Sequence, residues 1–107
     1  MDETPCPVQV TLSVIGGKWK PVILWNIAQE TVRFNQLHRQ IGDITQKMLT
    51  QELRQLEHSG LVRREVFPES PPHVEYSLTP HGQSLWPVLQ AMETWGTRHV
   101  DEIWNAN

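Results

Sequence analysis

Residues 45–60 read TQKMLTQELRQLEHSG, and this stretch decides the fold. At about 100° per residue, its leucines share one helix face: Leu49, Leu53 and Leu56. The opposite face carries cations, amides and a hydroxyl: Lys47, Thr50, Gln51, Arg54 and His58. Thr45 can cap the first turn with its hydroxyl oxygen, and Gly60 favours the left-handed conformation that ends a helix. The stretch predicts an amphipathic helix that presents the side chains used to contact base edges and phosphates, although an ordinary surface helix carries such residues too.

The preceding sequence predicts a partner for this helix. Residues 33–41, RFNQLHRQI, have the pattern of a short helix, with Asn35 as its cap and Leu37 and Ile41 on its buried side. The four residues 42–45 between the two helices begin with glycine. A short glycine-containing link of this kind is the turn of a helix-turn-helix.

The following sequence predicts a two-stranded ribbon. LVRREVF (61–67) and VEYSLT (74–79) read as strands, and the proline-rich PESPPH (68–73) separates them. In the second strand, apolar Val74, Tyr76 and Leu78 alternate with polar residues, as in a half-buried strand. Helix, turn, helix and ribbon together predict an α+β, mostly α, winged helix-turn-helix.

The predicted wing carries few cations. Arg63 and Arg64 are adjacent, so their side chains point to opposite faces of the strand and at most one is well aimed at a phosphate. The tip contains no lysine or arginine, and His73 is its only potential cation. Two interpretations of His73 stay open: a solvated turn residue, or a pH-dependent phosphate contact.

Two more helices are expected before the helix-turn-helix. Cys6-Pro7 opens the first, with Val8, Leu12 and Ile15 at helical spacing. The second spans about 18–29, with these residues turned inward: Trp19, Val22, Ile23 and Ile27. A short extended piece is expected at 32–34.

The C-terminal sequence predicts a long helix with a broad apolar face. Thr79-Pro80 is a helix start, and Pro87 predicts a kink or two abutting helices near Trp86. The apolar face beyond it comprises Val88, Leu89, Met92, Trp95, Gly96, His99, Val100 and Ile103, with Trp104 at its flank. An intramolecular core helix is one interpretation. We expect instead a two-fold dimer interface, with Gly96 permitting close approach, formed by these residues: Val8, Leu12, Leu89, Met92, Trp95, Gly96, His99 and Ile103.

Length and composition narrow the class of protein. The 107 residues predict one domain, with the helix-turn-helix at about 35–59, the wing at about 61–79 and the C-terminal dimerisation helix at about 87–104. No signal peptide or membrane span is visible, and a single cysteine excludes an internal disulfide, so a cytoplasmic location is expected. The histidines include no pair at metal-ligand spacing on one helix: His38, His58, His73, His81 and His99. No metal or other cofactor is expected, and no catalytic motif is present.

The charge is unevenly distributed. The net charge is −3, but residues 33–64 hold six cations and three acids, a local balance of +3, which leaves −6 for the rest. Screening limits electrostatic reach to about 8 Å at physiological salt, so a phosphate backbone responds mainly to the local excess. The acidic total is also the best support for a rival function, a winged helix that binds protein instead of DNA.

With these elements in place, the sequence resembles the HxlR family of bacterial winged-helix regulators, relatives of the MarR type. The resemblance rests on CPV and IGGKW near the N-terminus, RFNQL, ITQKMLTQELRQLEHSGLVRR and FPESPPHVEYSLTPHG, and covers about residues 6–100. It implies a homodimeric DNA-binding transcription regulator, with a recognition helix at 45–58 and a wing at 67–74. The family's wing tip often ends in a basic residue where this chain has His73.

Cys6 also matches a family position, and in some relatives a cysteine here senses electrophiles or oxidants. A helix N-terminus favours the thiolate, whereas Asp2 and Glu3 oppose it. No second cysteine can resolve an oxidised Cys6 within the chain, so oxidation would link it to the partner subunit or to a small thiol. An inert cysteine that merely precedes the helix is the alternative.

These features predict a mechanism for double-stranded DNA binding. Two recognition helices would enter successive major grooves about 34 Å apart on an inverted-repeat operator. We expect Gln51 and Lys47 to contact base edges and Thr50 to touch a thymine methyl. The expected phosphate contacts are Thr45, Gln46 and Arg54 in the recognition helix, and Arg63, Arg64 and His73 in the wing. The signal is open: an oxidant at Cys6, or a small molecule in a tryptophan-lined cavity beside the C-terminal helix.

Overall fold

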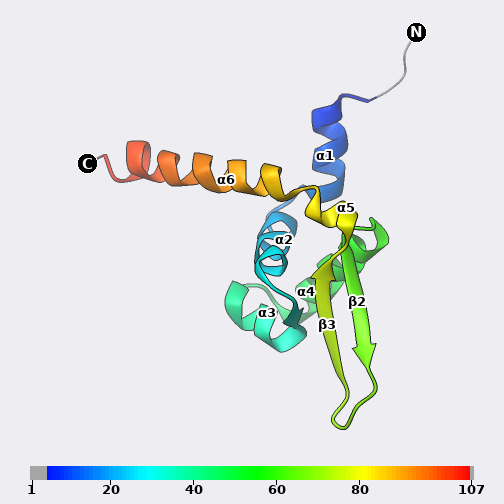
Figure 1. Ribbon diagram of the computed structural model, residues 1–107. Helices are drawn as coiled ribbons and strands as arrows, with labels where there is room; N and C mark the ends of the chain where they lie inside the picture. Colours follow the sequence, from blue (N-terminus) through cyan, green and yellow to red (C-terminus); the bar gives the residue numbers. More distant parts are fainter. Residues whose placement is uncertain (1–4, 107) are drawn as a thin grey trace.

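The chain forms a helical body with a long β-hairpin on one side (Figure 1). The computed structural model describes residues 5–106. In chain order its elements are α1 (Pro7–Ile15), α2 (Lys20–Gln29), β1 (Val32–Arg33), α3 (Phe34–Ile41), α4 (Gln46–His58), β2 (Val62–Phe67), β3 (His73–Leu78), α5 (Pro80–Gln83), α6 (Trp86–His99) and the π-helical η1 (Val100–Trp104). This is the mostly helical α+β winged helix-turn-helix that the sequence predicts.

The core lies where α2, α3 and α4 meet. The three leucines of α4 predicted to face inward, Leu49, Leu53 and Leu56, are at most 1% exposed. Leu37 of α3 and Leu24 of α2 are fully buried in the same core. Burying a leucine side chain contributes about 1.5–3 kcal/mol. The hydrophobic effect therefore fixes which face of α4 is turned to solvent.

The sheet is antiparallel, in the order β1-β3-β2. Because β3 is central, Tyr76 pairs with Val32 of β1 on one side and with Arg64 of β2 on the other. Val32 and Tyr76 are buried in the core. The predicted extended piece at 32–34 is thus β1, although Phe34 already begins α3.

Two predictions about side chains are wrong. Asn35 does not cap α3, because the helix begins one residue earlier and no side chain caps it. Val22 is 39% exposed, and Leu24 takes the inward place.

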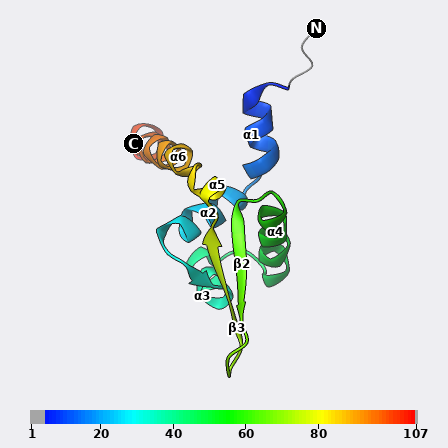
Figure 2. The same cartoon turned by 45° about the vertical axis from the view of Figure 1, so that its right-hand side comes forward.

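The chain turns from the wing into its C-terminal helix as expected. Thr79 caps the short α5 by accepting a hydrogen bond from the Gly82 N–H at 2.9 Å. A separate helix, α6, begins at Trp86 with Pro87 in its first turn, so two helices abut there. Figures 1 and 2 show α6 and α1 projecting away from the body in different directions.

Candidate DNA-binding surface

The outer face of α4 is open to solvent. The exposed side chains include Gln46, Lys47, Gln51 and Arg54, and Thr50 between them is half-buried. These five residues line one shallow hollow on the surface. No element of the described chain turns Lys47 or Gln51 inward or covers it, so the predicted recognition helix presents a continuous polar surface.

Two hydroxyl groups at α4 are already partly used. Thr45 Oγ1 accepts a hydrogen bond from the Met48 N–H at 3.0 Å, the cap that the sequence predicts. Its own proton stays free to donate to an acceptor such as a phosphate oxygen. Thr50 Oγ1 donates to the Gln46 carbonyl at 2.9 Å, so what Thr50 offers outward is its methyl group and oxygen lone pairs.

The turn between α3 and α4 is fixed by a histidine whose role the sequence did not predict. His38 Nε2 lies 2.7 Å from the Ile44 carbonyl oxygen, to which it donates. Gly42 begins the turn at φ +89°, in the left-handed region that favours glycine, and Ile44 is buried. The start of α4 is thereby tied to the end of α3. In the sequence, the only indication of this contact is that His38 precedes Ile44 of the turn by six residues.

The cations of this region are mostly free of carboxylate partners. Across residues 5–106, no acid lies within ion-pair distance of Lys47, Arg54 or Arg64. Glu52, the acid on the inner side of α4, pairs with Lys20 of α2 at 3.5 Å. An outer face with unpaired cations attracts polyanions more strongly than the net charge indicates.

The structure separates the two adjacent wing arginines. Arg64 pairs across the sheet with Tyr76, on the helix side, and lines a hollow together with Thr50 and Arg54 of α4. Arg63 points to the other face, where it pairs with Glu65 at 3.2 Å. Arg64 is therefore the wing arginine that shares a surface with the recognition helix.

His73 is not a solvated turn residue, which was one of the two interpretations of its sequence position. It is the first residue of β3, and its side chain is only 15% exposed. Its Nε2 lies 2.9 Å from Glu75 Oε2, and its ring stacks on Phe67 at a centroid distance of 4.8 Å. A phosphate contact by His73 would have to compete with this carboxylate.

Cys6 is exposed and immediately precedes α1, as its N-cap residue. Its side chain caps no N–H group of the helix. The acidic residues expected to influence it, Asp2 and Glu3, lie outside the described residues. The structure thus leaves the thiol accessible at a helix N-terminus.

Most residues of the predicted dimer interface are exposed on α1 and α6. Val8 and Leu12 of α1 are 66% and 59% exposed, and Trp95 of α6 is 65% exposed. His99 stacks on Trp95 at 4.9 Å and meets Trp104 edge to face. The remaining predicted members include Met92, Gly96 and Ile103, none of them buried. Leu89 differs: it is 3% exposed because it anchors α6 in the core of its own chain.

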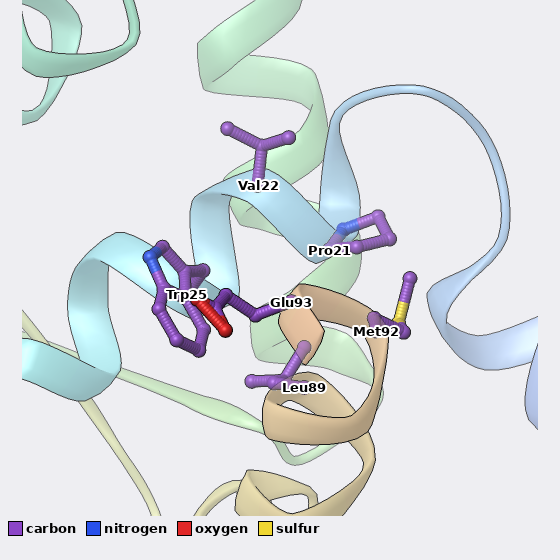
Figure 3. Close-up of a pocket in the computed structure, with 6 residues that line it drawn as sticks. All are labelled: Pro21, Val22, Trp25, Leu89, Met92 and Glu93. Atoms are coloured by element: carbon purple, nitrogen blue, oxygen red, sulfur yellow. The ribbon is translucent and has the colours of Figure 1, made fainter. Parts of the chain in front are cut away.

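An apolar hollow of about 260 Å³ lies between α2 and α6 (Figure 3). Its walls include Val22 and Trp25 of α2 and Leu89 and Met92 of α6. Trp25 also stacks on Trp86 at 5.1 Å, so this aromatic pair fixes the angle at which α6 leaves the body. The sequence suggested a tryptophan-lined cavity beside the C-terminal helix, but Trp25 is the one tryptophan among the residues that line this hollow. The hollow also explains why Val22 is exposed.

Two other kinds of site are absent from the described residues. No described helix has the length and hydropathy of a membrane span. In the same part of the chain, no three histidine, cysteine or carboxylate side chains are grouped to hold a metal ion.

A solvent-facing polar helix, a short fixed turn before it and an adjoining β-hairpin define the winged helix-turn-helix class of DNA-binding proteins. Within this class, the chain belongs to the HxlR-like helix-turn-helix family, whose model matches residues 14–103. It is therefore a transcriptional regulator, and the family is not one of enzymes.

Known proteins support this assignment. The chain is 47% identical over 98 residues to the uncharacterized HTH-type transcriptional regulator YdeP of Bacillus subtilis, a match that covers 92% of this chain and 77% of that protein. It resembles the redox regulator HypR in its oxidized form with a TM-score of 0.84 and 48% identity, covering 87% of this chain and 96% of the other. The chain also resembles a MarR-family transcriptional regulator from Porphyromonas gingivalis W83, with a TM-score of 0.85 and 36% identity. This match covers 91% of this chain and 95% of the other.

Proposed function

We propose that the chain is a cytoplasmic homodimer that binds an inverted-repeat operator sequence-specifically and so regulates transcription. The observation that carries the proposal is the exposed face of α4, with Lys47, Gln51 and Arg54 free of partners in the described chain. A helix of this kind fits the major groove, whose width of about 12 Å admits one helix.

Each side chain of the surface has a role suited to its chemistry. Gln51 reads adenine through two hydrogen bonds, and Lys47 donates to guanine. Arg54 and Arg64, which line one hollow, bind backbone phosphates together with Thr45 and Gln46. Thr50 contributes its methyl group to a thymine contact, because its hydroxyl proton is held by the Gln46 carbonyl.

The shape of the chain supports the dimer. Its radius of gyration is 15.9 Å, whereas a compact domain of this length has about 13 Å. The difference comes from α1 and α6, which carry exposed apolar side chains without a covering element in the described chain. Pairing these helices around a two-fold axis would bury that surface and give the dimer two copies of α4.

The proposal includes a regulatory signal: oxidation of Cys6 changes DNA binding. An accessible thiol at a helix N-terminus supports it, as does the similarity to the redox regulator HypR. Oxidation would join Cys6 to a small thiol or to the partner subunit, and would alter α1 within the dimer.

A gel-shift titration tests the proposal. The probe is the DNA beside the chain's own gene, and random duplex of equal length is the comparison. We expect the chain to bind the DNA beside its own gene more tightly than the random duplex. Treatment with the thiol oxidant diamide should change this affinity for wild type and leave the affinity of Cys6→Ser unchanged. Equal affinity for both probes, nearly independent of salt, would instead favour a protein-binding winged helix.

A further inference from the structure

A further polar hollow, of about 600 Å³, lies between the start of α3 and the wing tip. Arg33 and Arg39 line one side, and Pro71 and Pro72 of the tip line the other. Neither arginine belongs to α4 or to the wing strands β2 and β3. The hollow is thus separate from the surface of the recognition helix.

Both arginines are available to a ligand. Each is exposed, and no carboxylate of residues 5–106 lies within ion-pair distance of either one. Two acids near Arg33 have other partners. Glu75, which lies opposite Arg33 in the sheet, pairs with His73. Glu30, three residues before Arg33, accepts a hydrogen bond from Gln36 at 3.4 Å. Two free guanidinium groups beside one hollow form a strong site for an anion.

The wing tip lacks the cations that a DNA-binding wing needs. Residues 68–72 include Glu69 as their only charged side chain, and His73 is paired with Glu75. A tip that approaches a phosphate backbone alone would be repelled by Glu69. The arginines across the hollow supply the missing positive charge, because they share its walls with the tip.

We propose that Arg33 and Arg39 together bind a phosphate of the DNA backbone next to the groove that α4 enters. The inference rests on the proposed function, since it requires a duplex at the wing. A guanidinium group binds phosphate through two parallel hydrogen bonds, and Asn35 at the same wall can donate a further one.

The test is a salt titration with generic DNA, because a phosphate contact does not depend on sequence. The probe is a fluorescein-labelled, mixed-sequence duplex of about 30 base pairs, long enough for two half-sites. Fluorescence anisotropy gives the affinity at several salt concentrations between about 50 and 200 mM, the range over which phosphate contacts dominate. The variants are Arg33→Gln/Arg39→Gln, which keeps much of each side-chain stem, and Arg33→Lys/Arg39→Lys, which keeps the charge. Lys18→Gln, outside all these surfaces, is the matched control.

We expect the glutamine pair to lower affinity about tenfold or more and to reduce the salt slope by roughly 0.9 for each phosphate that is no longer neutralised. The lysine pair should recover most of the slope, and Lys18→Gln should match wild type. Circular dichroism of each variant establishes that it is folded. A folded glutamine pair with wild-type affinity and slope would overturn this inference and leave the proposed function intact. Wild type that binds neither this duplex nor the DNA beside its own gene would overturn both.

A separate arm distinguishes a free anion from the DNA backbone. Sodium phosphate is titrated into the isotope-labelled chain while the arginine Nε signals are recorded by NMR. Saturable shifts of Arg33 and Arg39 at millimolar phosphate, with duplex affinity unchanged in the glutamine pair, would assign the hollow to a small anion and contradict the proposal.

Discussion

At the scale of single residues, position relative to the core decides what each polar side chain does. His38 and His58 lie near the ends of consecutive helices, yet His38 is half-buried and bonded to the Ile44 carbonyl, whereas His58 is exposed. Arg63 and Arg64 are neighbours in sequence but belong to opposite faces of the sheet. Composition alone does not distinguish the members of either pair.

His38→Ala should destabilise the protein by about 1–3 kcal/mol, because it leaves the carbonyl of the buried Ile44 without its partner. Urea denaturation followed by circular dichroism measures this change. His58→Ala is the control and should shift the midpoint little. Equal midpoints for the two variants would show that the hydrogen bond does not hold the turn.

At the scale of elements, the helices and strands follow closely from the sequence pattern. Thr45 caps α4 as predicted, and the alternating residues of 74–79 form most of β3. The errors arise where contacts between elements determine the position of a side chain. No local pattern in the sequence shows that the hollow beside α6 exposes Val22, or that the N-cap residue of α3 is Arg33 and not Asn35. The candidate DNA-contacting residues of α4 were found from their helical face, while His38 was missed because its partner is a backbone carbonyl.

The junction between the wing and α5 depends on a glycine. A Cβ atom on Gly82 would clash with the Leu61 carbonyl oxygen, which is backbone and cannot move aside freely. Leu61 is itself held by the Thr79 N–H, which donates to the same carbonyl at 3.0 Å. The start of β2 and the first turn of α5 are thus packed backbone against backbone.

Gly82→Ala should therefore lower stability, although alanine is ordinarily better than glycine in a helix by about 1 kcal/mol. We expect a loss of about 1–3 kcal/mol, as for an overpacked core. Thermal unfolding measures it, with the exposed neighbour Gln83→Ala as control. A rise in melting temperature for Gly82→Ala would mean that the close approach is absent in solution.

At the scale of the whole molecule, the chain exposes more surface than a compact monomer of its mass. Its accessible surface is 7732 Å², against about 6,100 Å² for a folded monomer of this mass. Trp95, Ile103 and Trp104 are each more than half exposed on the projecting C-terminal helix of α6 and η1. The proposed dimer accounts for both features.

Trp95→Glu should weaken dimerisation about a hundredfold, because it places an unpaired charge in an apolar interface. Sedimentation velocity over a range of protein concentrations measures the dissociation constant. Thr97→Glu, on the opposite side of α6, introduces the same charge and should remain dimeric. A monomeric wild type, or a Trp95→Glu variant as dimeric as wild type, would contradict the proposed interface.

The central claim is that the outer face of α4 reads DNA sequence, and comparing Gln51→Ala with Arg54→Ala tests it most directly. Affinity is measured by anisotropy for the operator, for operators altered at single base pairs and for random duplex, at several salt concentrations. Gln51→Ala should lose about 1–3 kcal/mol of discrimination at one base position and keep the salt slope. Arg54→Ala should weaken binding to every duplex alike and lower the slope by roughly 0.9 for each phosphate left without its cation. If the two variants behave identically, or if neither changes binding, α4 is not the helix that reads the DNA.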